Sequence, residues 1–598
     1  MFSDVLAQIE PRLNLSHSRT GIHDPSARIE AISTVDKGID TAQQFVRSLL
    51  THRNALVPIS LLPPEILAWV FHLLALKEPP FSGRRELGWI RVTHVCRHWR
   101  EVALDNSSLW AKITCGMPTN TKWMSEILAR AKNTLLDIEF HTLTETGPEA
   151  LFMIPPHLSH TRQLRGHMCA PHSDCVREIY CCEAPALEHF KLTSNSYSPI
   201  PFPDLGGNML FKGRAPRLRT FSLSHVVIPW SLVPRGQITQ LKIVYPESGD
   251  PEFDEDDYSS GNLNQLIDLL VNCPALETLV LDSCLPSQLT EHPHYRTIHL
   301  PHLSYLRIRD STSRIMSMLK MLKLPSSTTL QSLHLDCISE ITPIHDSEGP
   351  LLALISAQFQ CPVPVKFKSL TATIESRTTS LFYIRASTFP STLLNRQAQN
   401  IEGDIVGNAE LVLSFDRLSK PGHSMDLLEQ ACKMLPISSL QFISVSATNL
   451  IDINWVELFG CCTNVTSMQA IGHGTSSLVR ALTAPTVTNA GSSKGGRKRN
   501  RVNREMTLVQ PASTVAHAHT AIFPNLMFLE LTGLEFMIEH PLAVPFNVFK
   551  RGLQQRMAAS GEPLKFLRFK KCDIIDSYAI KLRKLVEVFE WDKYEAII

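Results

Sequence analysis

CPALETLVL, at residues 273–281, is the clearest copy of a motif that recurs along most of the chain. A proline or small residue comes first, and the pattern Leu-x-x-Leu-x-Leu follows. The last two leucines, Leu279 and Leu281, alternate as side chains do on a β-strand, so both point to one face. The first, Leu276, is placed to pack beneath them where the chain turns into the strand.

Further copies lie on both sides of this motif. Between residues 187 and 330 the leading apolar residues of consecutive copies are 20 to 38 residues apart, and such self-similarity is typical of repeat architectures. Clear copies are APALEHFKL (184–192), APRLRTFSL (215–223), LPHLSYLRI (300–308), TTLQSLHL (328–335), FPNLMFLEL (523–531) and PLKFLRF (563–569). Weaker copies are NTLLDIEF (133–140), QITQLKI (237–243), ISSLQFISV (437–445) and TNVTSMQA (463–470).

Helical patterns lie between the copies. In NQLIDLLVNC (264–273), for example, Leu266, Leu269 and Leu270 share one face. Strands that alternate with helices at this spacing predict a parallel sheet with helices outside it. We therefore predict an α/β fold in which residues 133–598 form an irregular solenoid that resembles leucine-rich-repeat proteins. The asparagine ladder of regular repeats is absent, and a non-repeating α/β domain with leucine-rich strands is the alternative.

Residues 1–57 predict a polar N-terminal segment followed by an amphipathic helix over residues 26–54. Apolar residues recur there at steps of three or four, which places them on one helix face. Pro58 ends this helix because it lacks an N–H group and restricts the residue before it. The apolar residues are Ile29, Ile32, Val35, Ile39, Ala42, Val46 and Leu49.

Residues 58–112 predict a compact helical module. Pro63 and Pro64 stand where a helix begins, and Glu65 follows near the positive end of the helix dipole. Two adjacent apolar rows run along this helix, and Pro79 and Pro80 end it. A second helical pattern follows through Val92, Val95, Cys96, Trp99, Val102 and Ala103. A module of this size with helices that are apolar on several sides needs a further surface to cover it.

The module resembles a known family. LPPEIL and WVFHLL, followed by VCRHWREVALDNSSLW, resemble the F-box in the form common in large fungal families, and the resemblance covers Ile59–Trp110. Lys77–Gly88 departs from the compact pattern because it is longer and contains more proline and glycine. The family folds as a small helical unit that docks on the Skp-type adaptor of a cullin ubiquitin ligase. The alternative is an ordinary amphipathic helical pair that starts a larger domain.

The resemblance implies a set of adaptor-binding residues. Leu62 and Pro63 would lie on the adaptor, with support from Ile66 and Phe71. The later members of the set would fill the small core, touch the adaptor or close the module. The predicted set is Leu62, Pro63, Pro64, Glu65, Ile66, Phe71, Val95, Cys96, Trp99, Leu109 and Trp110.

Two insertions interrupt the array of motifs. Residues 247–261 are acidic, contain no basic residue and predict a solvated loop without the pattern of an EF-hand. Residues 484–520 form a basic insertion that could serve as a nuclear address or contact phosphates, and a disordered loop without a role is the alternative. Its basic residues are Lys494, Arg497, Lys498, Arg499, Arg501 and Arg504.

The sequence contains no recognisable catalytic motif. A cluster of His167, Cys169, His172, Cys175, Cys181 and Cys182 has the residue types that bind Zn²⁺, but its spacings differ from those of the usual zinc sites. Buried structural thiols are the simpler interpretation. We therefore predict no catalytic residue, metal or cofactor, and expect that the protein is not an enzyme.

Composition limits the possible partners. The chain of 598 residues has a net charge of +1, and 43% of its residues are hydrophobic, which excludes a wholly disordered protein. The balanced charge gives no general attraction to nucleic acid or to an anionic membrane, so neither is an expected partner. The cysteines show no disulfide framework, and no signal peptide or membrane span is visible. We expect an intracellular protein, cytoplasmic or nuclear.

The resemblance favours one function among three. The protein would be the substrate-recognition subunit of a Skp–cullin–F-box ubiquitin ligase, with an unknown protein target bound by the repeat-like region. A non-catalytic scaffold with the same two parts is the second hypothesis. An enzyme or metal-dependent protein built on the Cys/His cluster is the third.

Overall fold

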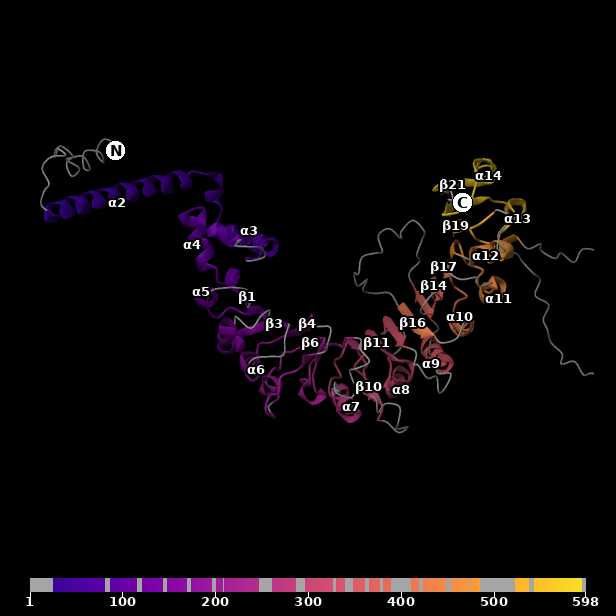
Figure 1. The fold of residues 1–598 in the computed structure, drawn as a ribbon, viewed down its shortest axis with the longest axis horizontal. Coiled ribbons are helices and arrows are strands. Elements are labelled where there is room, and N and C mark those ends of the chain that lie inside the picture. Colours follow the sequence, from indigo (N-terminus) through magenta and orange to yellow (C-terminus); the bar gives the residue numbers. More distant parts are fainter. Residues whose placement is uncertain are drawn as a thin grey trace, which may run out of the picture. The chain divides into compact units, whose positions relative to one another are not determined.

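A computed structural model of the chain defines two compact units, which Figure 1 traces from the N-terminus to the C-terminus. The first comprises Met1–His167 and His172–Leu187, and the second comprises Met168–Pro171 and Glu188–Ile598. Among the described residues, no helix is long and apolar enough to cross a membrane. The described residues are 25–80, 87–115, 121–142, 148–168, 174–195, 200–207, 209–246, 261–286, 296–325, 330–338, 348–360, 365–376, 380–388, 410–418, 423–447, 453–472, 474–483, 522–536 and 543–593.

The predicted N-terminal helix is present as α2, Pro25–Ala55. None of its described side chains is buried, and its apolar row from Ile29 to Leu49 is open to solvent. An isolated helix gains most of its stability in proteins from packing of an apolar face. This face of α2 has no such packing within the described part of the chain.

The helical module consists of two α-helices joined by 3₁₀ turns: η1 Pro58–Leu61, α3 Pro64–Lys77, η2 Gly88–His94, α4 Arg97–Asp105 and η3 Ser107–Trp110. Helix α3 begins at Pro64 as predicted, because the first turn of a helix tolerates a missing N–H group. The predicted second helix is shorter than its apolar pattern. Val92 and Val95 precede α4, which begins where the Cys96 sulfur accepts a hydrogen bond from the Trp99 backbone N–H at 3.5 Å.

Three strands complete the first unit. Strand β1 (Lys112–Cys115) pairs in parallel with β2 (Leu136–Thr142), and β3 (Thr161–Met168) also pairs with β2. Ile138 and Phe140 of β2 are buried on one face. Helix α5, Thr121–Ala131, contributes Ile127 and Leu128 to this core. The remaining helical elements are η4 Pro148–Met153, η5 Pro155–His160 and α6 Asp174–Tyr180.

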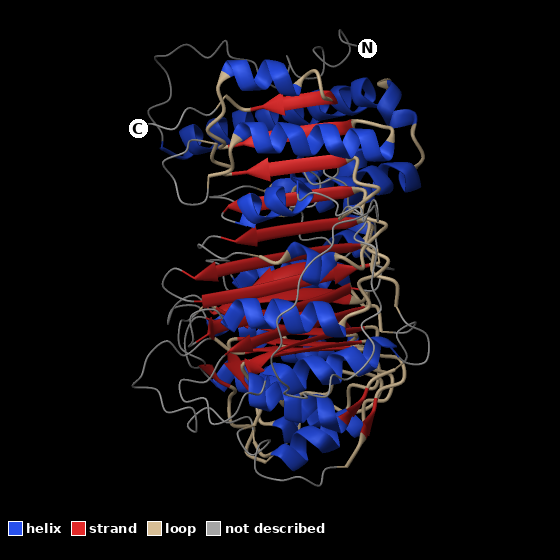
Figure 2. Ribbon diagram, turned by 90° about the vertical axis from the view of Figure 1, so that its right-hand side faces the viewer, coloured by secondary structure: helices blue, strands red, loops and turns tan. Residues whose placement is uncertain are grey.

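The second unit is built on a largely parallel sheet, whose strands lie side by side in Figure 2. In spatial order the strands are β4 His189–Ser194, β6 Thr220–Ser224, β8 Gln240–Val244, β9 Thr278–Asp282, β11 Tyr305–Ser311, β13 Ser332–Ile338, β16 Glu410–Leu418, β15 Ser380–Ser387, β14 Ser369–Ser376, β17 Phe442–Ala447, β18 Ser467–Gly472, β19 Phe528–Thr532, β20 Leu564–Lys570 and β21 Val586–Trp591.

Each copy of the leucine motif in this unit lies on one of these strands. In the central copy Leu279 and Leu281 are buried, and Leu279 lies in register with Leu306 of β11. The leading Leu276 is also buried, as predicted from its place at the turn into the strand. One face of the sheet is therefore apolar, while the alternate residues project from the opposite face. That face is partly exposed at β11 and β13, and it is buried at Ser444, Gln469 and Glu530.

Helices cover the apolar face of this sheet, and α7 to α13 follow one side of the strands in Figure 1. Helix α7 begins where the Asn262 side chain accepts a hydrogen bond from the Gln265 backbone N–H at 3.0 Å, and its buried leucines include the predicted Leu266, Leu269 and Leu270. The helices are α7 Leu263–Val271, α8 Thr312–Met321, α9 Glu348–Gln360, α10 His423–Met434, α11 Trp455–Phe459, α12 Gly474–Thr483, α13 Phe546–Ser560 and α14 Asp576–Leu582. Short elements are β5 Ile200–Pro201, β7 Val226–Val227, β10 Ile298–His299, β12 Leu322–Lys323, η6 Leu210–Gly213 and η7 Trp230–Leu232.

The prediction of parallel strands fails at β15. This strand pairs antiparallel with β14 and with β16, and β13 pairs with β16 rather than with the next strand in the chain. The short connection between β14 and β15 allows a hairpin, whereas a parallel pair needs a longer crossover. Of the predicted acidic loop only Gly261 is described, and the basic insertion at 484–520 lies outside the described residues.

Candidate partner-binding site

Two aromatic pairs form the core of the helical module. Leu67 and Phe71 of α3 are buried, and the Phe71 ring lies 5.3 Å from the Trp99 ring, centroid to centroid. The rings of Trp89 and Trp110 meet edge to face at 5.0 Å. Such tilted and edge-to-face contacts are favourable for aromatic rings. The module therefore has a small core of its own.

Trp110 closes this core and connects it to the helix that follows. Its indole N–H donates a hydrogen bond to the Ala103 carbonyl at 2.8 Å. The guanidinium of Arg130, on α5, lies 4.6 Å from the centre of the Trp110 ring, which places a cation over the ring face. The resemblance assigned this closing position to Leu109 and Trp110, and both are buried.

Gly88 brings the chain back against the end of α3. Its φ angle is +53°, in the left-handed region that favours glycine. A Cβ atom there would lie 2.6 Å from the carbonyl oxygens of Glu78 and Pro79. The next residue, Trp89, donates its backbone N–H to the Glu78 carbonyl at 2.9 Å. The longer connection between the helices is thus closed by a glycine.

The opposite side of α3 is an exposed apolar surface, which we call the outer apolar face. Its members on the helix lie three or four residues apart or side by side, so they share a side of α3, and Leu62 precedes the helix. Ile66 is 48% exposed and Trp69 is 69% exposed, although both side chains are large and apolar. Val95, at the end of η2, is also exposed. The outer apolar face consists of Leu62, Ile66, Trp69, Val70 and Leu73.

The predicted adaptor-binding residues therefore divide into three groups by their exposure. Phe71, Leu109 and Trp110 are buried, so they support the surface instead of forming it. Trp99 and Cys96 are half-buried. The exposed members are Leu62, Pro63, Pro64, Glu65, Ile66 and Val95.

Sequence reasoning missed Trp69 and Leu73. The apolar residues of α3 surround most of its circumference, so periodicity alone did not show which side faces the core. The number of apolar residues around α3 could have indicated them. A helix that is apolar all round leaves part of its apolar surface uncovered when it packs on one side only.

A second surface, which is polar, lies on the face of the sheet opposite the buried leucines in the second unit. We call it the charged strip. Asp336 accepts hydrogen bonds from Arg307 at 3.2 Å and from the Ser414 hydroxyl at 2.8 Å. Arg385 forms an ion pair with Glu410 on the adjacent strand. The charged strip consists of Arg307, Arg309, His334, Asp336, Arg385, Glu410 and Asp416, contributed by β11, β13, β15 and β16.

The ionised state of Glu410 in the charged strip is stabilised by its neighbours. Burial would raise the pKa of Glu410, but the nearby His334 and the charge of Arg385 outweigh burial and hold that pKa below its ordinary value. The carboxylate is therefore ionised at neutral pH. Fixed charges of both signs on a partly exposed strand face suit recognition of a polar protein surface.

The predicted Cys/His cluster is only partly described. Outside the described residues lie Cys169, His172 and the side chain of Cys175. Cys181 and Cys182 are half-buried thiols that belong to no group capable of holding a metal among the described residues. His167 lies beside Glu139 and His141 of the neighbouring strand β2 instead.

Comparison with known families identifies the helical module. Residues 59–116 match the F-box-like family model, so the chain contains an F-box-like domain at the place where the sequence predicted it. F-box domains generally bind Skp-type adaptors. No curated protein matches the chain.

Proposed function

We propose that the protein is the substrate-recognition subunit of a Skp–cullin–F-box ubiquitin ligase. The observation that carries this proposal is the outer apolar face, which leaves Ile66, Trp69 and Val70 exposed on the F-box-like domain. Contiguous apolar patches on a protein surface mark interaction sites. The Skp-type adaptor is the partner we assign to this face.

The outer apolar face has the composition of a binding hot spot. Burial of one exposed aliphatic side chain contributes about 1.5–3 kcal/mol, and exposed tryptophans are among the residues that contribute most to binding. Trp69 stands at the centre of the face, between Ile66 and Leu73 along the helix. Its burial against a partner would remove the largest exposed apolar side chain of α3 from water.

We assign target recognition to the second unit. Its partly exposed face with the charged strip would bind a protein target, and the unit itself would be a leucine-rich-repeat-like solenoid in which the hairpin at β14 and β15 is an irregular insertion. Parallel strands with helices on one face support this assignment. The chain would carry out no bond chemistry. It would raise the effective concentration of the target beside the transferring enzyme.

Co-purification with a Skp-type adaptor tests the proposal. Ile66→Asp places a charge in the outer apolar face and should weaken adaptor binding at least about tenfold, because an unpaired charge in an apolar interface is costly. The double variant Leu62→Ala, Pro63→Ala should weaken binding through the adjacent positions. Equal adaptor binding by these variants and the wild type contradicts the proposal.

Ile580→Asp is the matched control. Ile580 lies on α14 of the second unit, is 56% exposed and receives the same substitution on a helix. It should leave adaptor binding unchanged. A target that binds the second unit and accumulates when the proteasome is blocked supports ubiquitin transfer, whereas a bound target of constant abundance indicates a scaffold.

A further inference from the structure

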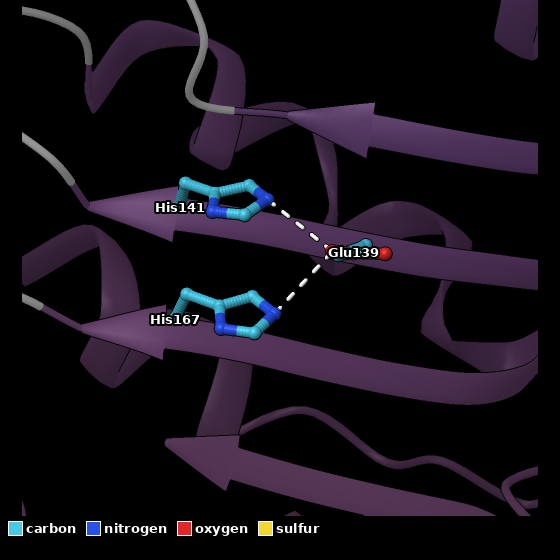
Figure 3. Close-up of side chains that lie close together, drawn as sticks. All are labelled: Glu139, His141 and His167. Carbon is cyan, nitrogen blue, oxygen red and sulfur yellow. Dashed lines mark ion pairs between the residues drawn. The ribbon is translucent and has the colours of Figure 1, made fainter. Parts of the chain in front are cut away.

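Two histidines and one glutamate meet on the sheet of the first unit. Glu139 and His141 lie two residues apart on β2, so their side chains project from the same face, and His167 lies on the neighbouring strand β3. Figure 3 shows the two imidazole rings side by side with their Nε2 atoms directed at the same carboxylate. The rings are stacked with centroids 4.6 Å apart and 10° between their planes.

The distances between the carboxylate oxygen and the two imidazole nitrogens suit shared coordination of a metal ion better than hydrogen bonds between them. Glu139 Oε1 lies 3.4 Å from His141 Nε2 and 3.3 Å from His167 Nε2. Charge-assisted hydrogen bonds are shorter, about 2.7–2.9 Å. In a tetrahedral zinc site with bonds of about 2.0–2.2 Å, neighbouring ligand atoms lie about 3.3–3.5 Å apart.

The ligand set favours the same interpretation. Two imidazole nitrogens and one carboxylate oxygen are a set of protein ligands that binds zinc. The three ligand atoms already lie within 4.8 Å of one another, and small rotations of the two histidine side chains would close the remaining gap.

We propose that Glu139, His141 and His167 form a binding site for a zinc ion. Imidazole nitrogens favour zinc and its transition-metal neighbours over Mg²⁺ and Ca²⁺, which prefer oxygen ligands. The side chains are 18% (His141), 29% (Glu139) and 31% (His167) exposed, so an ion can reach them from solvent. Three protein ligands leave the fourth tetrahedral position for water or for a donor group of a bound molecule.

The ion would also join two strands. Glu139 and His141 hold it from β2, and His167 holds it from β3, so binding would stabilise the folded first unit in proportion to the zinc concentration. This inference is independent of the proposed function, because no step of it depends on adaptor or target binding.

The test measures zinc binding to the full-length chain without a histidine tag. The protein is stripped with a chelator, titrated with Zn²⁺ and analysed for bound metal, and Co²⁺ then serves as a visible-absorption probe of tetrahedral geometry. The wild type should bind one ion at this site. Glu139→Gln, His141→Ala and His167→Ala should each lower the affinity by about 100-fold or more, since loss of outer-shell partners alone costs 10–100-fold.

His334→Ala is the matched control, because His334 is a histidine with a 21% exposed side chain that also faces a carboxylate, Glu410, at 3.6 Å. It should bind zinc as the wild type does, and zinc should raise the melting temperature of both proteins but not of the three site variants. Should His141→Ala not fold without metal, the near-isosteric Glu139→Gln decides. Absence of zinc binding, unchanged affinity in the site variants, or the intense absorption of Co²⁺ bound by thiolates would overturn the assignment.

Discussion

The Phe71 and Trp99 rings pack at a centroid distance of 5.3 Å with 57° between their planes, and they join α3 to α4. Phe71 is buried, whereas Trp99 retains some exposure to solvent. The buried ring is therefore the larger contributor to the stability of the helical module. The resemblance allowed Trp99 either to fill the small core or to touch the adaptor.

Phe71→Ala should lower the free energy of unfolding by about 3–5 kcal/mol, as other truncations of buried phenylalanines do. Trp99→Ala should cost less, because its ring is only half-buried. Denaturant unfolding of the purified chain measures both. Trp69→Ala is the control: its side chain is exposed, so it should leave stability unchanged while weakening adaptor binding. A larger loss for Trp99→Ala than for Phe71→Ala would refute the assignment.

Gly88→Ala should destabilise the module by about 2–5 kcal/mol. The left-handed backbone costs an alanine about 1–2 kcal/mol, and its Cβ would overlap the carbonyl oxygens of Glu78 and Pro79. Gly207→Ala is the matched comparison, since Gly207 has a φ of +80° but, apart from its chain neighbours, no atom of the described residues lies within 4 Å of the position that a Cβ would occupy. It should show the backbone cost alone. Equal melting temperatures for the two variants would contradict the role of the close approach.

Acid should weaken the second unit through Glu530, whose side chain is only 2% exposed. Burial would raise the pKa of Glu530, but hydrogen bonds from Lys570 and Gln469 outweigh burial and lower it below the ordinary 4.5. A depressed pKa in the folded state stabilises the fold above the unfolded pKa, and the stabilisation is lost as the pH falls through the folded pKa.

Glu530→Gln should therefore cost about 1.5–3 kcal/mol at pH 7 and flatten the decline of stability below about pH 4.5. Urea unfolding from pH 7 to pH 3 measures this slope. Glu590→Gln is the control, because Glu590 is half-exposed and its ion pair with Arg568 is screened by solvent. Identical pH profiles for Glu530→Gln and the wild type would exclude this linkage.

Cys461 should be alkylated faster at neutral pH than the buried thiol of Cys432. Interaction with the Cys462 thiol, with the two sulfurs 3.8 Å apart, lowers the pKa of Cys461, whereas burial raises the pKa of Cys432 to about 12. The thiolate is the reactive form of cysteine. Peptide mass spectrometry after brief iodoacetamide treatment compares the two.

Cys462→Ala should slow alkylation of Cys461 because it removes the neighbouring thiol, and Cys462→Ser should preserve it because a hydroxyl can still donate a hydrogen bond to the thiolate. Equal rates in these two variants would show that the neighbouring thiol does not activate Cys461.

The sequence alone was sufficient for features that depend on neighbouring residues. The steps of three and four in α2 and α3 and the alternation of Leu279 and Leu281 are local, because side-chain direction along a helix or strand follows from backbone geometry. The F-box-like domain was also found this way, since its anchors lie close together in the chain.

Tertiary structure decided which apolar side of α3 faces the core, because Leu67 and Ile66 are equally apolar and only contact with Trp99 and its neighbours distinguishes the two sides. The place of the antiparallel strand β15 between β14 and β16 was also visible only in the tertiary structure, because no leucine motif marks these strands. Likewise, Glu139 and His141 meet His167 only because β2 pairs with β3. Such relationships depend on pairing between distant segments, and a pattern of neighbouring residues carries no information about that pairing.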